Sequence, residues 1–315
     1  MPHFLNHDFE FALILSGDQL YQMDFNEMLE AHIDNGADIS IATLPVNAKD
    51  APEFGILKTN DANFIEAFIE KPAAELLPQW ESDVSEEMKQ QGKHYLASMG
   101  IYIFNKKLLI ELMKNPETKD FGKEIIPQAV GKQKILSYQY EGYWTDIGNI
   151  ESFFDANIGL TNDIPDFNLF DNDNKIYTIP RLLPPSKFKS THLDNSLISE
   201  GCIINAKAIK KSVIGNRSRI GEGTVIENSY IMGNDFYQSL TDMKEDIENE
   251  NQLIGIGERC YINHALVDKN CRIGNDVYIN VGKHLTNCSE ELYCIKDGIV
   301  VIKKGKTLPD NFRIE

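Results

Sequence analysis

Two aspartates stand where strands in the first half of the chain are expected to end. Asp18 follows the apolar run Phe11–Leu15, and Asp146 lies between a strand and a helix in YWTDIGNIESFF. Ligands of open parallel sheets bind outside the carboxyl ends of the strands. Two carboxylates there predict a shared Mg²⁺, an ion that takes few protein oxygens and completes its shell with water and phosphate. The alternative is that each aspartate only caps the helix that follows it.

A carboxylate and a lysine end another expected strand. In FIEAFIEKP the strand ends on Glu70 and Lys71, just before Pro72. A lysine can grip a phosphate as a point charge, and the acid beside it can accept hydrogen bonds from sugar hydroxyls. The pair therefore indicates a site for a phosphorylated sugar, although Glu-Lys at a strand end is also common on ordinary surfaces.

Small residues on a third expected strand suggest a floor for that sugar. In ASMGIYIF, the period of two places Ser98, Gly100 and Tyr102 on one face. A sugar ring needs small residues beneath it. A close contact between a helix and the sheet would give the same pattern, so both interpretations stay open for this segment taken alone.

The elements that must position these residues alternate along the chain. Up to about Thr161, strand-like runs follow helix-like runs, which predicts an α/β layer fold with a mostly parallel sheet. The unbroken apolar run Phe11–Leu15 is typical of a strand buried on both faces of such a sheet. In DFNEMLEAHIDNG, Asp24 and Glu27 have the spacing of a capping box, and Gly36 is expected to end the helix.

After about residue 190 the pattern changes to a six-residue repeat. Aliphatic residues recur at this spacing, with one five-residue step, at Ile214, Ile220, Ile226, Ile256, Ile262, Val267, Ile273 and Ile279. An aliphatic residue followed by a small one every six positions is typical of a parallel β-helix, in which each hexad forms one side of a coil. An ordinary antiparallel β domain with spaced isoleucines is the alternative. The acidic stretch Ser239–Asn251 interrupts the repeat and is expected to be a solvated loop.

Composition excludes several classes of protein. The chain has 315 residues, enough for two domains, and a net charge of −17. Such an acidic protein is not expected to bind nucleic acid, and no apolar run is long enough to predict a membrane span. We expect no secretory signal peptide in MPHFLNHDFE. Five cysteines without a C-x-x-C pair favour reduced thiols in the cytoplasm over disulfides or a structural zinc.

The order of these motifs resembles that of the bacterial and plant glucose-1-phosphate adenylyltransferases. The resemblance runs from about Phe11 to the C-terminus through LILSGDQLYQMDF, EFGILK, FIEKP, LASMGIYIF, DFGKEIIPQAV, GYWTDIGNIESFFDANIGLT, IPRLLPPSK, SVIGNRSRIGEGTVIENSYIMG and GIVVIKKGKTL. It implies an α/β nucleotidyltransferase domain followed by a left-handed β-helix, assembled as a tetramer. It also implies synthesis of ADP-glucose for glycogen or starch.

The resemblance assigns catalytic roles to three of the residues. Asp18 and Asp146 would hold Mg²⁺, and Asp18 would also help to activate the attacking phosphate. Lys71 would bind the phosphate of glucose 1-phosphate. A phosphate oxygen would attack the α-phosphorus of ATP, and pyrophosphate would leave. The protein would act by positioning the reactants and neutralising charge.

The same resemblance assigns the sugar contacts. Glu70, Ser98 and the backbone at Gly55 would contact the glucose. One departure lies beside the metal site, where the family often has histidine after the strand-end aspartate and this chain has Gln19. A second lies between Lys71 and Ser98, where a charged segment is expected to form an acidic helix over the site.

The largest departure is at the start of the chain. Family members open with a strand and a glycine-rich loop that cradles the nucleotide phosphates, and nothing in this sequence resembles it. We therefore expect the chain to lack the N-terminal part of the catalytic domain. Its activity is then expected to be impaired unless a partner chain supplies that part.

Three regions and three functional hypotheses follow. We expect a catalytic domain over 1–162, a linker over 163–190 and a β-helix domain over 191–315. The first hypothesis is the adenylyltransferase. The second is a non-catalytic regulatory or scaffold subunit of such an enzyme. The third is a β-helix acyltransferase, for which His264 is the only histidine within the hexads.

Overall fold

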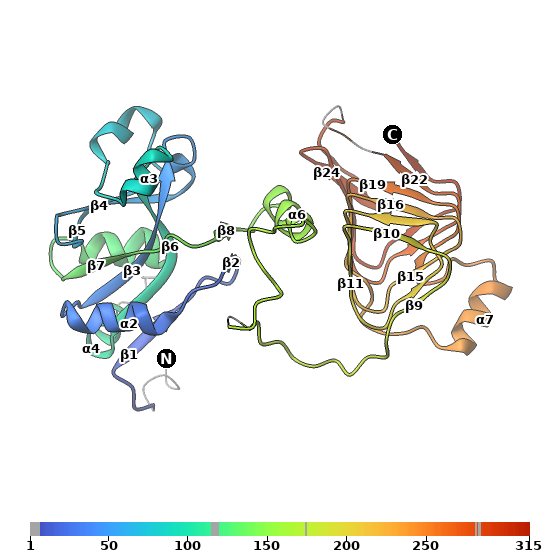
Figure 1. The fold of residues 1–315 in the computed structure, drawn as a ribbon, viewed down its shortest axis with the longest axis horizontal. Coiled ribbons are helices and arrows are strands. Elements are labelled where there is room, and N and C mark those ends of the chain that lie inside the picture. The colour runs from blue at the N-terminus through green and yellow to red at the C-terminus, as the bar shows by residue number, and fades with distance from the viewer. Residues whose placement is uncertain (1–6, 115–119, 174, 281, 283–284) are drawn as a thin grey trace. The chain divides into compact units, whose positions relative to one another are not determined.

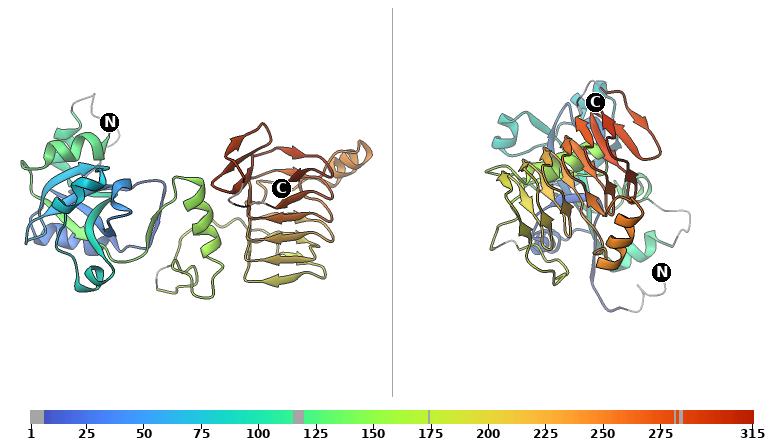
Figure 2. Two further views of the ribbon diagram at one scale, coloured as in Figure 1. Left: turned by 90° about the horizontal axis from the view of Figure 1, so that it is seen from above. Right: turned by 90° about the vertical axis from the view of Figure 1, so that its right-hand side faces the viewer.

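The computed structural model describes residues 7–114, 120–173, 175–280, 282 and 285–315. The chain divides into two compact units, Met1–Trp144 and Thr145–Glu315, and each is described by itself. Both are drawn in Figures 1 and 2. Within the described residues, no helix combines the length and apolar character needed to cross a membrane.

The first unit is built around one mixed sheet. Its elements in chain order are β1 (Phe11–Ile14), β2 (Gln19–Tyr21), α2 (Phe25–Asp34), β3 (Ile39–Asn47), η1 (Ala51–Glu53), β4 (Gly55–Thr59), β5 (Ile65–Glu70), η2 (Ala74–Gln79), α3 (Glu86–Gln90), β6 (Lys93–Asn105), α4 (Lys106–Leu112), η3 (Phe121–Ile125), α5 (Ile126–Ala129) and β7 (Ile135–Gln139). The strand β8 (Trp144–Asp146) spans the boundary between the two units. The strand order of the sheet is β5-β4-β6-β3-β7, and β1 also pairs with β6. The expected strand at Phe11–Leu15 forms as β1, but it is not buried on both faces, because Leu13 is 41% exposed and Leu15 is 45% exposed.

The expectation of a mostly parallel sheet is wrong for the described strands. β6 runs antiparallel to β1, β3 and β4, and β4 runs antiparallel to β5. Only β3 and β7 pair in parallel in this sheet. The reason is partly local, because β4 and β5 are joined by a short turn, in which the Asn60 side chain accepts from the backbone N–H groups of Ala62 and Phe64. Such a turn can join only antiparallel neighbours.

Helices cover both faces of this sheet (Figure 1). On one face, Met28 of α2 packs against Met99, Ile101 and Ile103 of β6. On the other, residues of α4 and α5 pack against Tyr102 and Phe104 of the same strand. Alternate residues of β6 therefore enter opposite layers, as the period of two requires.

The helix α2 begins and ends where the sequence predicts. Asp24 is its N-cap, and its carboxylate accepts from the backbone N–H of Asn26 at 2.8 Å. Gly36 follows the helix with a φ of +57°, a value that favours glycine. The segment between Lys71 and Ser98 differs from the expected single acidic helix. It contains two short helices, η2 and α3, because Pro78 lies within the first and limits its length.

The second unit is mainly a coil of short parallel strands. After α6 (Ile150–Gly159) its elements are β9 (Lys187–Phe188), β10 (His192–Asp194), β11 (Leu197–Ile198), β12 (Ile203–Ile204), β13 (Ala208–Lys210), β14 (Val213–Ile214), β15 (Arg219–Ile220), β16 (Val225–Glu227), β17 (Tyr230–Ile231), α7 (Leu240–Glu248), β18 (Gly255–Ile256), β19 (Tyr261–Asn263), β20 (Ala265–Val267), β21 (Arg272–Ile273), β22 (Tyr278–Asn280), β23 (Cys288–Ser289), β24 (Tyr293–Lys296), β25 (Ile299–Ile302), β26 (Thr307–Leu308) and β27 (Arg313–Ile314). They form three sheets, and Figure 2 shows the coils stacked side by side. In one of these sheets, β23 and β24 add antiparallel pairs beside β25.

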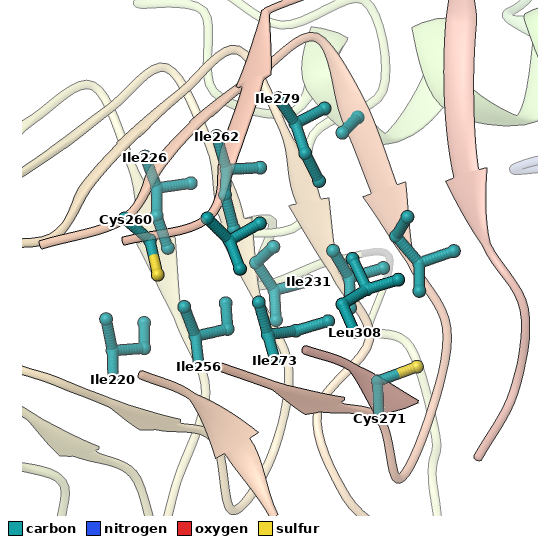
Figure 3. Packing of buried hydrophobic residues seen from close by; sticks show 14 of the residues in the cluster. Ile220, Ile226, Ile231, Ile256, Cys260, Ile262, Cys271, Ile273, Ile279 and Leu308 are labelled. Carbon is teal, nitrogen blue, oxygen red and sulfur yellow. The ribbon is translucent and has the colours of Figure 1, made fainter. Parts of the chain in front are cut away.

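The predicted hexads form the core of this β-helix. Ile220 pairs with Ile256, which pairs with Ile273, so one inward position repeats from coil to coil. All eight predicted aliphatic residues are buried, and Figure 3 shows several of them packed inside the coil. The glycine after Ile220 is required sterically, because a Cβ at Gly221 would lie 2.5 Å from the backbone of Gly257 in the next coil.

The acidic interruption is a helix rather than a loop. Ser239 and Asp242 form a capping box that starts α7, which projects from the β-helix (Figure 1). Asp246 of α7 forms an ion pair of 2.6 Å with Arg272 of β21. The sequence contained this capping-box spacing, but the surrounding charge favoured a solvated loop.

The five cysteines are free thiols, as expected. Cys202, Cys260 and Cys271 are buried in the β-helix core. Burial raises the pKa of each of these thiols, that of Cys271 to about 11. These three side chains therefore pack as small apolar groups in the coil.

Candidate active site

Three of the predicted sugar-binding residues lie on three neighbouring strands. Gly55 of β4 pairs with Glu70 of β5. On the other side of β4, Ile56 pairs with Ala97 of β6. Among the described residues, the pairing of β4 with β6 extends no further, and Ser98 is the next residue of β6 after Ala97. We call residues 98, 55 and 70, which lie near one another on β6, β4 and β5, the row.

Lys71 follows this row in an unusual backbone conformation. Its φ is +47°, in the left-handed region that non-glycine residues rarely adopt. Its backbone N–H donates to the carbonyl oxygen of Phe54 at 3.0 Å, which fixes the residue beside β4. The side chain is exposed, whereas the following Pro72 is buried. The strand therefore ends in a strained, well-anchored turn that carries the lysine.

Tyr102 lies beside Ser98, and Asp120 lies near Tyr102. The Ser98 hydroxyl lies close to Tyr102, whose side chain is 6% exposed, and it accepts from the backbone N–H of Gly100 at 3.4 Å. Burial raises the pKa of Tyr102, the neighbouring Ser98 hydroxyl opposes that rise, and the nearby charges of Asp120 and Glu70 add to it. The ring of Phe121 stacks on Tyr102 with centroids 5.9 Å apart. Tyr102 is therefore neutral at physiological pH and lies close to both carboxylates.

Asp18 lies at the loop that leaves β1. The last residue of β1, Ile14, pairs with Tyr102. The Ser16 hydroxyl donates to Asp18 Oδ1 at 2.5 Å, and the Asp18 side chain is exposed. A bulge in β6 places Gly100 beside this loop, since a Cβ there would lie 3.5 Å from the Cβ of Ser16. The β1 loop therefore passes close to the strand that carries Ser98.

The two aspartates do not cap helices. Asp24 is the N-cap of α2, and Asn149 is the N-cap of α6, accepting from the N–H of Ser152 at 2.9 Å. Asp146 instead accepts from the N–H of Gly148 at 2.7 Å and is partly buried. The helix-cap alternative is therefore wrong for both Asp18 and Asp146.

The donor chemistry of these carboxylates fits a hard divalent cation. Asp18 Oδ2 accepts no hydrogen bond from the described part of the chain, and its neighbour Ser16 adds a neutral oxygen. The described residues contain no group of three or more histidine, cysteine or acidic side chains arranged to hold a metal. Asp18 and Asp146 belong to different units, so their shared Mg²⁺ stays a prediction.

Sequence reasoning missed several residues of this region. Asp120 and Phe121 contact or face Tyr102, and Trp144 donates from Nε1 to Gln19 Oε1 at 3.2 Å. These residues occur in the motifs DFGKEIIPQAV and GYWTDIG. The signal that could have found them was their presence in those motifs, because no local periodicity marks them.

The fold is that of a nucleotidyltransferase domain followed by a left-handed β-helix. Residues 2–163 match the family model "Nucleotidyl transferase", and residues 181–312 match "GLGC left-handed parallel beta-helix domain". The chain is 40% identical over 316 residues to the glucose-1-phosphate adenylyltransferase small subunit, chloroplastic/amyloplastic, of Triticum aestivum, over 97% of this chain and 67% of that relative. The chain belongs to the glucose-1-phosphate adenylyltransferase family.

These comparisons confirm the predicted family and the predicted order of a nucleotidyltransferase domain and a left-handed β-helix. The domain limits 1–162, 163–190 and 191–315 stay predictions. So do the expected loss of an N-terminal part and the role of each site residue.

Proposed function

We propose that this chain carries out glucose-1-phosphate adenylyltransferase chemistry, converting ATP and glucose 1-phosphate into ADP-glucose and pyrophosphate for glycogen or starch synthesis. The observation that supports it most directly is the pairing of Gly55 with Glu70, with Lys71 directly after Glu70 and Ser98 on the neighbouring strand β6. The name of the wheat relative favours this activity over the scaffold subunit and over the acyltransferase.

In this proposal, glucose lies over the row of residues 98, 55 and 70. The Glu70 carboxylate accepts from sugar hydroxyls, and the missing side chain at Gly55 lets that carboxylate and the Phe68 ring pack over β4. The Lys71 ammonium holds the sugar phosphate by charge. These side chains thereby orient the phosphate oxygen toward the α-phosphorus of ATP. This orientation is their main contribution to the reaction rate.

We further propose Mg²⁺ as the metal, held by Asp18 and Asp146. When bound, the ion neutralises charge on the phosphoryl groups. The Ser16 hydroxyl, which donates to Asp18 Oδ1, orients that carboxylate. Assembly as a tetramer, or with a partner chain that supplies further catalytic elements, and a cytoplasmic location complete the proposal. The free cysteines support a reducing compartment.

The test is pyrophosphate release from ATP, glucose 1-phosphate and Mg²⁺ by the full chain. Steady release that depends on all three components supports the transferase. Glucose 1-phosphate binding without any turnover at high protein concentration favours the regulatory or scaffold subunit instead. Replacing ATP with the other nucleoside triphosphates in the same assay tests the nucleotide preference.

A further inference from the structure

One indole ring connects the loop of Asp18 to the turn of Lys71. Trp144 Nε1 donates to Gln19 Oε1 at 3.2 Å, and Gln19 directly follows Asp18. The Trp144 ring also meets the ring of Phe54 edge to face, with centroids 5.6 Å apart. The carbonyl oxygen of Phe54 accepts the backbone N–H of Lys71 at 3.0 Å. Gln19, Trp144 and Phe54 therefore form a continuous path between the two predicted functional residues.

The other end of the Gln19 amide faces the strand of Ser98. A Cβ at Gly100 would lie 3.3 Å from Gln19 Nε2, so the amide packs directly on the β6 bulge. Gly100 has a φ of +68° and lies two residues beyond Ser98. A single side chain thus contacts both the indole and the bulge, and it adjoins Asp18 in the chain.

We propose that Gln19 and Phe54 are positioning residues. They act through Trp144 to fix the position of Asp18 relative to Lys71. The inference rests on the proposed function, and it deepens that function by naming two residues that need not touch the substrate. A partly buried indole N–H needs an acceptor, and Gln19 supplies it. Without that acceptor the ring can turn away from Phe54. Phe54, whose carbonyl oxygen accepts from the Lys71 N–H, then loses its packing against Trp144, and Lys71 can shift. Small displacements of reacting groups lower reaction rates strongly.

Tryptophan emission provides a direct readout of this path. The chain has two tryptophans, so Trp80→Phe leaves Trp144 as the only indole. Glucose 1-phosphate is titrated into this parent chain with Mg²⁺ present, and the emission of Trp144 is followed. Gln19→Leu removes the acceptor and is expected to weaken sugar-phosphate binding about fivefold, the size of one neutral hydrogen bond. Gln19→His retains a ring nitrogen as an acceptor and is expected to restore most of the affinity.

The matched control is Gln128→Leu. Gln128 is exposed on α5 and lies outside the path, so this variant is expected to bind like the parent chain. Melting midpoints of all variants separate binding from folding. A purely structural role for Gln19 would lower the midpoint without a change in affinity, which overturns the inference. Equal losses in Gln19→Leu and Gln128→Leu also overturn it.

A double-mutant cycle tests the shared dependence on Trp144. Phe54→Leu removes the ring but keeps the carbonyl group that accepts from Lys71. If both residues act through the same indole, the double variant loses less affinity than the product of the single losses. Losses that multiply overturn the inference. A parent chain that gives no emission response to glucose 1-phosphate and releases no pyrophosphate overturns the proposed function and the inference together. A parent that binds normally, with Gln19→Leu equal to it, overturns the inference alone.

Discussion

Gly55 and Glu70 stand opposite one another on β4 and β5, and the Glu70 carboxylate lies over the space that a side chain at position 55 would need. A Cβ at Gly55 would lie 2.9 Å from Glu70 Oε2 and 2.7 Å from the Phe68 ring. Glycine at this position therefore lets an acid and an aromatic ring close over the strand. The relationship suggests a direct test of the sugar site.

Gly55→Ala is expected to displace Glu70 and Phe68 and to weaken glucose 1-phosphate binding roughly tenfold. The methyl group cannot be accommodated at these distances without movement, and overpacking costs about 1–3 kcal/mol. Calorimetric titration with glucose 1-phosphate measures the loss. Gly159→Ala is the control, because nothing lies within 4 Å of its added Cβ. Unchanged affinity in Gly55→Ala would remove this strand from the sugar site.

Lys71→Gly is expected to stabilise the first unit while it weakens sugar-phosphate binding. The left-handed backbone at Lys71 costs a non-glycine residue about 1 kcal/mol, which glycine recovers, whereas the ammonium that holds the phosphate is lost. Urea unfolding and ligand titration measure the two effects, and nucleotide affinity is expected to change far less.

Lys211→Gly provides the matched control for that experiment. Lys211 has a φ of +45° in the β-helix, so its replacement is expected to add stability without any effect on glucose 1-phosphate. Equal losses of sugar-phosphate and nucleotide affinity in Lys71→Gly would contradict the assignment of Lys71 to the sugar phosphate.

Asp18→Asn is expected to weaken Mg²⁺ binding in the presence of ADP-glucose by at least tenfold, with a melting midpoint close to that of the unchanged chain. The side chain is exposed and its hydrogen bond comes from the neighbouring Ser16, so folding depends little on it. Asp24→Asn is the control, because asparagine is an equally good N-cap and Asp24 lies outside the metal site. Mg²⁺ affinity that is the same in both variants would exclude the metal role of Asp18.

The β-helix could be predicted from the sequence because its signal is local. Each inward position stacks on the same position of the next coil, as Ile226 does on Ile262, so a six-residue spacing repeated along the chain is enough to assign the fold. The cap at Asp24 is local in the same way. Strand direction in the first unit has no such local signal, because the strands of a parallel sheet and those of a mixed sheet covered on both faces both give apolar runs.

The candidate site divides along the same line. Glu70 and Ser98 could be proposed from the sequence because strand ends and small residues have recognisable chemistry. Asp120 and Trp144 were missed because only tertiary contacts place them there. The charge of Asp120 raises the pKa of Tyr102, which lies on a different element. Trp144 hydrogen-bonds to Gln19, which is 125 residues earlier in the chain. No period or spacing in a single sequence carries that information.

Buried His32 is expected to make the first unit less stable as the pH falls. Its side chain is 1% exposed, and its ring nitrogens hydrogen-bond to Ser40 Oγ at 2.7 Å and Asn105 Oδ1 at 3.2 Å. Burial lowers the pKa of His32, and the Asn105 hydrogen bond and the charge of Asp38 only partly oppose this. Below pH 6.5, the unfolded chain therefore binds a proton that the folded chain does not.

The sign of the effect follows from this proton. Stability is fully present above pH 6.5 and decreases as the pH falls below that value, by at most roughly 1.4 kcal/mol per pH unit until the folded state also protonates. Both tryptophans lie in the first unit, so urea unfolding followed by tryptophan emission at pH 8, 6.5 and 5.5 reports its stability. His32→Gln is expected to lower stability at pH 8 but to show a weaker dependence on pH. The same pH dependence in both proteins would mean that other groups cause it.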